Sequence, residues 1–153
     1  MVDDRAFLEE AIALARRNID DGGRPFGALV VRDWKVLAVG VNRIHATNDP
    51  TSHAELNAIR GASQALGSPR LVGCVVYASG HPCPMCLAAM LLTGVREVVY
   101  ALSNEDAEPF GLSTASVYAE LAKPAPELSI KLRHLPVAVS GKSLYPYWQS
   151  GDS

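Results

Sequence analysis

The spacing of hydrophobic positions along the chain changes several times between a helical and an extended pattern. Apolar residues recur every three to four positions from Phe7 to Ala15, which predicts an amphipathic helix that ends before the Gly22-Gly23 pair. A continuous apolar run over 74–78 is typical of a strand that is buried on both faces. Together the patterns predict helices over 4–20, 52–66 and 84–93, a hairpin of strands over 26–31 and 36–41, further strands over 74–78, 97–101 and 129–135, a short helix around Val117 to Leu121, and an aromatic tail over 145–148.

The order of these elements, in which helices alternate with strands, is typical of a layered α/β protein. A helix between two apolar strands favours a parallel, right-handed crossover, whereas a hairpin is antiparallel, so we expect a mixed sheet with helices on both faces. The chain has no fixed-period repeat, and its 153 residues match the length of one ordinary domain. We therefore expect a single domain over residues 1–153.

Composition and charge exclude several classes of protein. Hydrophobic residues make up 48% and charged residues 20%, which excludes a disordered or collagen-like chain. Lys+Arg 14 against Asp+Glu 16 gives a net charge of -2, which does not attract nucleic acid or an anionic membrane. No apolar run approaches the ~20 residues of a membrane span, and the acidic start lacks the layout of a signal peptide. We therefore expect a cytoplasmic protein.

Two segments at expected helix starts carry residue types that bind metals. The first runs from Thr51 to Glu55 (Thr-Ser-His-Ala-Glu) and the second from Pro82 to Cys86 (Pro-Cys-Pro-Met-Cys). Each also has an ordinary structural interpretation, because Ser52 and Glu55 fit a capping box and the two cysteines flank a helix that begins with a proline. The cysteine count of three is odd, which argues against a disulfide framework and leaves metal ligation or reduced thiols.

If the two helix starts face each other, the imidazole of His53 and the thiolates of Cys83 and Cys86 converge on one point. Side chains in a first turn point toward the helix N-terminus, whose positive end stabilises thiolates. Zinc binds such ligands tetrahedrally at roughly 2.0–2.3 Å, and three protein ligands leave a fourth position open, as in catalytic sites. The remaining candidate ligands are Cys74 inside an apolar strand, His45, His134 near a strand end, and His81, whose two-residue separation from Cys83 is tight for the same ion.

An open zinc site gives Glu55 a chemical role. Zinc lowers the pKa of a bound water to about 7, and a neighbouring carboxylate can take that proton and deliver it to a substrate. His-x-Glu together with Pro-Cys-x-x-Cys is the signature of zinc deaminases, in which the glutamate is a general acid/base and not a ligand. The sequence therefore predicts a hydrolytic deaminase with Glu55 as its catalytic residue.

At these residues the sequence resembles the cytidine deaminase superfamily, and within it the small bacterial guanine deaminases. The resemblance runs from the first helix to about Tyr118 and is carried by Arg24 to Ala28, Asn42, Thr47 to Glu55, Ala58 to Arg60 and Pro82 to Cys86. It implies a three-layer α/β/α sandwich with a mixed five-stranded sheet, usually assembled as a homodimer. It also implies zinc on His53, Cys83 and Cys86, with Glu55 as the proton shuttle.

The resemblance further implies contacts to the substrate. Asn42 would hydrogen-bond the base and Phe26 would pack against its ring; the ordinary alternatives are a left-handed turn residue for Asn42 and a core residue for Phe26. The backbone N–H groups of Ala54 and Cys83, at helix starts, are placed to bind a carbonyl of the base.

Three departures from the guanine deaminase pattern bear on the substrate. His81 stands where a glutamate is common, and Ser113 and Thr114 stand where an acidic residue is usual, although Glu105, Asp106 and Glu108 lie just upstream. The chain also stops at Ser153, where those relatives extend a tail over a neighbouring active site. All three departures weaken the prediction that guanine is the substrate, and none of them affects the prediction that the reaction is a deamination.

The leading hypothesis is therefore zinc-dependent deamination of a free nucleobase, a purine such as guanine, by a homodimer without nucleic-acid or membrane partners. The enzymatic rivals are tRNA-adenosine deamination, which needs a surface that neutralises RNA phosphates, and cytosine deamination. The non-enzymatic rival is a zinc-stabilised interaction module, which would unfold on chelation.

Overall fold

The computed structural model describes residues 3–138 and 140–151 and divides the chain into two compact units, Met1–Ala119 and Glu120–Ser153. The first unit contains the sheet and both motif segments. Among the described residues, no helix combines the length and the hydropathy that crossing a lipid bilayer requires.

A mixed sheet forms the centre of the first unit. Its strands are β1 (Gly27–Arg32), β2 (Lys35–Val41), β3 (Cys74–Gly80) and β4 (Glu97–Leu102), in the order β2-β1-β3-β4. The pair β3–β4 is parallel, and β1 is antiparallel to both β2 and β3. The predicted hairpin is confirmed, and its turn places Asp33 and Trp34 at positive φ. The predicted parallel crossover is also confirmed, because helix α4 (Pro84–Thr93) connects β3 to β4.

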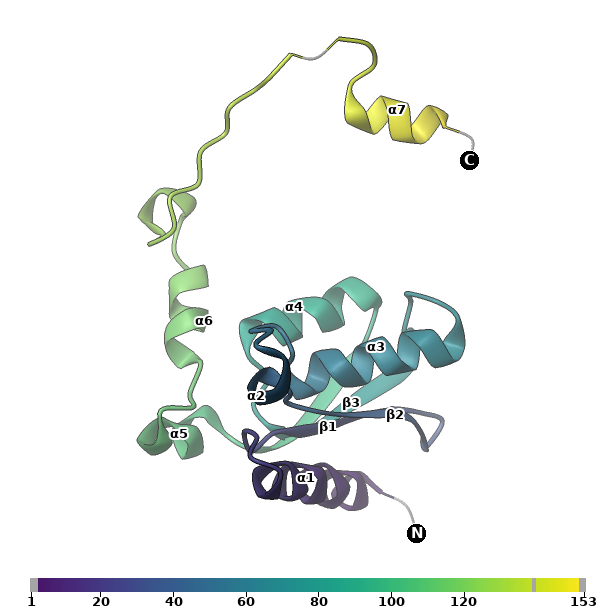
Figure 1. Cartoon of the computed structure of the whole chain (residues 1–153), viewed down its shortest axis with the longest axis vertical. Coiled ribbons are helices and arrows are strands. Elements are labelled where there is room, and N and C mark those ends of the chain that lie inside the picture. Colours follow the sequence, from purple (N-terminus) through teal and green to yellow (C-terminus); the bar gives the residue numbers. More distant parts are fainter. Residues whose placement is uncertain (1–2, 139, 152–153) are drawn as a thin grey trace. The chain divides into compact units, whose positions relative to one another are not determined.

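Helices cover both faces of this sheet (Figure 1). Helix α1 (Asp4–Asp20) lies on one face, and α3 (Ala54–Leu66) and α4 (Pro84–Thr93) lie on the other. The side chains of β3 alternate between the two cores, since Val76 packs with α3 and α4 whereas Tyr77 packs with Phe7 of α1. The α/β/α layering expected from the sequence is therefore present.

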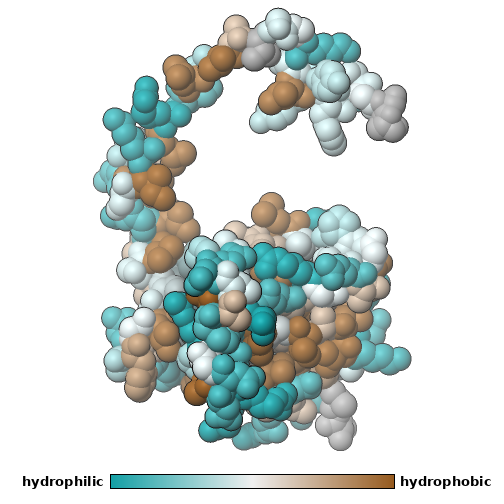
Figure 2. Space-filling view, viewed as in Figure 1, coloured by the Kyte–Doolittle hydropathy of each residue, from teal (hydrophilic) through white to brown (hydrophobic). Residues whose placement is uncertain are grey.

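The sheet has four strands, and the expected fifth strand over 129–135 is wrong. This segment forms neither helix nor strand, and its apolar side chains are exposed, with Ile130 at 76% and Leu132 at 69%. Apolar side chains on the surface of the second unit are visible in Figure 2. A strand needs hydrogen bonds to a neighbouring strand, and the described part of Glu120–Ser153 contains no strand that could supply them. Alternating hydrophobicity alone therefore did not produce a strand.

Several short helices lie outside the main layers. The predicted helix around Val117 to Leu121 is present as α6, and the aromatic tail is helical as α7, where Pro146 occupies the third position, within the first turn that tolerates proline. The short elements are α2 (Ile44–Thr47), α5 (Asn104–Ala107), η1 (Glu108–Phe110), α6 (Ala115–Leu121), η2 (Ala125–Glu127) and α7 (Leu144–Ser150).

Gly40 allows the start of α3 to approach strand β2 closely. A Cβ at this position would lie 2.3 Å from the carbonyl oxygen of Ala54 and 2.5 Å from the backbone nitrogen of Ala58. Both atoms are backbone, so they cannot move aside as a flexible side chain could. The close contact therefore fixes where the motif residues of α3 lie relative to the sheet.

We expect Gly40→Ala to destabilise the protein by about 1–3 kcal/mol, the usual cost of overpacking. The displaced helix start should also weaken zinc binding. Urea unfolding and zinc analysis check this. Gly61→Ala in α3 is the control, because a Cβ at Gly61 would meet only the Ala38 side chain, at 3.1 Å. Equal stability of the two variants would contradict the close-contact explanation.

Candidate active site

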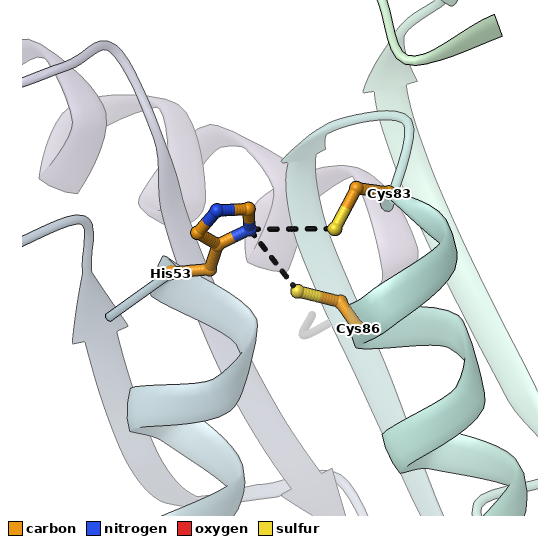
Figure 3. A group of neighbouring side chains, drawn as sticks. All are labelled: His53, Cys83 and Cys86. Atoms are coloured by element: carbon orange, nitrogen blue, oxygen red, sulfur yellow. Dashed lines mark hydrogen bonds between the residues drawn. The ribbon is translucent and has the colours of Figure 1, made fainter. Parts of the chain in front are cut away.

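Two helix starts bring the motif residues together (Figure 3). His53 is the N-cap of α3, and Cys83 is the N-cap of α4 with Pro84 at the first helical position. Cys86 follows in the first turn of α4 and is fully buried. The side chains of all three residues point into the space between the helix starts, as the sequence predicted.

The distances among these side chains fit a tetrahedral metal ion. His53 Nδ1 lies 3.4 Å from Cys83 Sγ and 3.5 Å from Cys86 Sγ, and the three atoms all lie within 4.8 Å of one another. Nitrogen and sulfur ligands at tetrahedral zinc distances would be about 3.6 Å apart. Within the part of the chain that the structure describes, the cluster has no fourth His, Cys, Asp or Glu. The donor set thus fits zinc with one open position.

The electrostatics of the cluster favour a thiolate. The Cys86 thiol, which donates a hydrogen bond to the Cys83 sulfur, and then His53 lower the pKa of Cys83 well below that of an ordinary thiol. The same contact raises the pKa of Cys86, and the Cys83 sulfur, as a hydrogen-bond acceptor, raises the pKa of His53. Without metal, the two sulfurs therefore share one proton, and binding a cation at both sulfurs requires the release of that proton.

The capping-box interpretation of the first motif is wrong. No side chain caps α3, and the Ser52 hydroxyl instead accepts a hydrogen bond from Asn57 Nδ2 at 3.1 Å. Glu55 therefore takes no part in a capping box, and its carboxyl group accepts a hydrogen bond from its own backbone N–H. Its side chain lines the cavity beside His53 and Cys83, and the residue is only 8% exposed.

Burial perturbs Glu55 strongly. Loss of hydration raises the pKa of Glu55 from 4.5 to about 7, because the charged form is disfavoured away from water. A carboxyl group with a pKa near neutrality can both accept and donate a proton, which is what general acid/base chemistry requires.

In the chelated, metal-free protein, the burial of Glu55 makes the free energy of unfolding depend on pH. Because the pKa in the folded state, about 7, exceeds the ordinary value of 4.5, the contribution is present below pH 4.5 and is lost as the pH rises through 7. We expect Glu55→Gln to be more stable than the wild type by about 3 kcal/mol at pH 8 and by under about 1 kcal/mol at pH 5. Urea unfolding at both pH values measures this, with the exposed Glu10→Gln as control. A difference independent of pH would refute the assignment.

A small cavity lies beside the cluster and contains the sequence-predicted substrate contacts. Its volume is about 190 Å³, below the ~300 Å³ at which pockets for drug-sized ligands begin. Phe26, Asn42, Ala54 and Cys83 all line it, together with His53 and Glu55. Cys86 lies beneath, in the core. The structure therefore brings all the predicted site residues to one place.

Asn42 is held in one orientation. It is buried, and its Oδ1 accepts a hydrogen bond from the Ile44 N–H at 3.1 Å. Its φ is not positive, so the left-handed turn interpretation is wrong. Because Oδ1 is engaged, the Nδ2 group is the part of the amide that remains for a ligand in the cavity.

The cavity also contains Arg24, whose side chain had no predicted site role, and the three positions that depart from the guanine deaminase pattern, His81, Ser113 and Thr114. Arg24 lines it, and its charge acts to lower the pKa of His53 against the larger effect of Cys83. His81 and the segment 111–114 complete the wall, and Asn104 hydrogen-bonds His81 from behind. No local pattern marks Asn104, since its partner is 23 residues away in the chain. The other candidate ligands, Cys74, His45, His81 and His134, lie outside the cluster.

Comparisons with known proteins identify the family. The family model for the cytidine and deoxycytidylate deaminase zinc-binding region matches residues 1–102. A guanine deaminase from Bacillus subtilis is 42% identical over 125 residues, which cover 81% of this chain and 80% of that protein. A tRNA-specific adenosine deaminase from Aquifex aeolicus is 29% identical over 143 residues, which cover 94% of this chain and 92% of that protein.

Solved structures agree with the sequence comparisons. The X-ray structure of guanine deaminase from Bacillus subtilis has a TM-score of 0.83 at 39% identity and covers 88% of this chain and 87% of its own. The structure of a guanine deaminase from Nitrosomonas europaea has a TM-score of 0.69 at 29% identity, and the match covers 74% of this chain and 66% of that one. The chain therefore belongs to the cytidine and deoxycytidylate deaminase family and is a zinc-dependent deaminase.

Proposed function

We propose that the chain hydrolytically deaminates a free nucleobase, a purine such as guanine, and releases ammonia. The observation that carries this proposal is the juxtaposition of the buried Glu55 with the His53, Cys83 and Cys86 cluster at the floor of a small cavity. The purine substrate is supported by the similarity to a protein named guanine deaminase over four fifths of both chains.

The donor set supports His53, Cys83 and Cys86 as the zinc ligands. When bound, zinc would activate a water molecule for attack on the ring carbon and stabilise the charge that develops there. Glu55 takes one proton of the attacking water and delivers it to the adjacent ring nitrogen. It then carries the second proton from the new hydroxyl group to the amine, so that the C–N bond breaks, ammonia leaves and the carbonyl forms. Its pKa of about 7 suits both directions of transfer.

The remaining predicted residues orient the base. The Asn42 Nδ2 group donates a hydrogen bond to it, and Phe26 packs against the ring face. The N–H groups of Ala54 and Cys83, at the starts of α3 and α4, bind a carbonyl of the base, because the first N–H groups of a helix have no intrahelical acceptor. Together these contacts hold the reacting carbon beside the cluster.

Ammonia release across a substrate panel tests the proposal. The panel contains guanine, adenine, cytosine, their nucleosides, triazine analogues and a tRNA substrate, each assayed with the zinc-loaded protein. We expect a free purine base to react fastest, and faster than its nucleoside, because the cavity is small. A preferred nucleoside would overturn the free-base proposal, and a preferred cytosine would overturn the purine proposal.

tRNA-adenosine deamination is the second candidate, since relatives with that name match up to 94% of this chain. The lower identity of these relatives and the net charge of -2 favour the free base. Tight tRNA binding that weakens steeply with salt would favour this candidate instead. Membership of an enzyme family leaves the non-enzymatic interaction module without support.

We also propose that the protein functions as a cytoplasmic homodimer, with residues 1–153 as one deaminase domain. Exposed apolar side chains on α4, with Leu91 at 73% and Leu92 at 78%, support the dimer, because such residues are frequent at homodimer interfaces. A monomeric mass in light scattering at micromolar concentration would contradict it.

A further inference from the structure

His81 is held rigidly at the wall of the cavity, beside the predicted ligand Cys83. Its backbone N–H donates to the Leu102 carbonyl at 2.9 Å. Its ring stacks on Tyr100 with a centroid distance of 4.6 Å and an interplanar angle of 4°, and on Tyr118 at 5.3 Å and 28°. Tyr118 in turn donates a hydrogen bond to the Pro82 carbonyl. The imidazole is therefore fixed in position and also in the plane of its ring.

Asn104 determines which nitrogen of His81 carries hydrogen. The Thr114 N–H donates to Asn104 Oδ1 at 3.2 Å, which fixes the orientation of the amide and directs Nδ2 toward His81. An amide nitrogen only donates, so His81 Nδ1, 2.9 Å away, must accept. The ring hydrogen then lies on Nε2, so this cavity-lining residue carries an N–H donor on its ring.

Thr114 adds a second polar group to the same wall. Its hydroxyl oxygen is buried and is the sole buried side-chain nitrogen or oxygen without a hydrogen-bond partner in the described residues. Thr114 lines the cavity together with His81, and Asn104 links the two residues directly. A buried hydroxyl without a partner is costly, so a rotation of the Thr114 side chain that brings the hydroxyl to a ligand in the cavity would be favourable.

This wall contains no carboxylate. Among the described residues that line the cavity, Glu55 is the only acidic one, and it lies beside the metal cluster. The ring N–H of His81 can only donate, so it pairs with a ring edge that presents an acceptor and not with one that presents only N–H groups.

We propose that His81, held by Asn104 so that its Nε2–H is turned to the base, and the Thr114 hydroxyl form a recognition wall that binds a hydrogen-bond acceptor on the base, a carbonyl oxygen or an unprotonated ring nitrogen. His81 and Thr114 determine specificity, and Asn104 is a positioning residue. This inference rests on the proposed function and names the ring edge that the enzyme selects.

The tautomer is tested without any substrate. Nitrogen-15 NMR of the histidine rings in the zinc-loaded protein should show His81 Nδ1 unprotonated and Nε2 protonated. Asn104→Asp keeps an acceptor for the Thr114 N–H but presents a carboxylate to Nδ1, so a hydrogen should appear on Nδ1. A protonated Nδ1 in the wild type would overturn the proposal.

Recognition is tested by pairing variants with substrate analogues. His81→Phe keeps a ring for stacking but loses the donor, whereas His81→Gln keeps a donor of similar reach. On guanine, we expect His81→Phe to lower kcat/KM by about tenfold, mainly through KM, and His81→Gln to recover most of the loss. 2-Aminopurine lacks the carbonyl, and 7-deazaguanine lacks a ring nitrogen. With whichever of these analogues lacks the acceptor that His81 binds, the loss in kcat/KM caused by His81→Phe should fall below about twofold.

Thr114→Val and Thr114→Ser form the matched pair for the hydroxyl, and only valine should lower kcat/KM. Equal losses on guanine and on both analogues would show that His81 acts only in packing and would overturn the proposal. If the wild type deaminates another base, the same comparison uses that base and its acceptor-deleted analogue. If the wild type deaminates no free base, the proposed function fails, and the NMR experiment still decides the tautomer.

Discussion

Glu55→Gln is expected to lower kcat by roughly 10²–10⁴-fold, the usual contribution of a general acid/base, while zinc binding is retained. Glu55 is buried at the cavity floor but is not part of the His53, Cys83 and Cys86 cluster. Glutamine preserves the shape of the side chain and cannot take a proton from water. Steady-state ammonia release and zinc analysis on the same preparation measure both quantities.

Glu10→Gln is the control for this experiment, because Glu10 is an exposed carboxylate on α1. It should leave both kcat and zinc content unchanged. Retained turnover in Glu55→Gln would remove Glu55 from the proton transfer, and loss of zinc would show that it holds the metal.

Cys86→Ala is expected to abolish both zinc binding and activity. Cys86 is fully buried and supplies one of the three ligand atoms, so its loss should cost more zinc affinity than the about 10–100-fold that follows loss of an outer-shell partner. Competition with a chromophoric chelator measures the affinity.

Cys74→Ala is the matched control, since Cys74 is an equally buried thiol but lies in β3 outside the cluster. It should lose some stability from the small cavity and keep its zinc. Similar zinc loss in both variants would mean that general destabilisation, rather than ligation, explains the effect of Cys86→Ala.

The metal cluster could be predicted from the sequence because its constraints are local. The three ligands come from two short motifs, each at a helix start, where Pro84 and the direction of first-turn side chains fix the geometry. The hairpin and the buried strand β3 were predicted for a similar reason, since each has its own hydrophobic pattern.

The features that the sequence failed to predict depend on distant partners. The segment 129–135 has the alternation of a strand but forms none, because strand formation depends on a neighbour that its own residues do not specify. The contact between Asn104 and His81 joins α5 to the loop after β3, and no spacing rule marks such a pair. The proposed recognition of the base depends on these contacts, so the sequence indicates the reaction more firmly than it indicates the base.

In the proposed site, His53, Cys83 and Cys86 hold zinc and leave one position open to solvent. X-ray absorption at the zinc edge of the active protein reads this ligand set. We predict two sulfur ligands at about 2.3 Å, one imidazole nitrogen at about 2.0–2.1 Å and one oxygen from solvent. A fourth protein ligand, or a sulfur number other than two, would contradict the account.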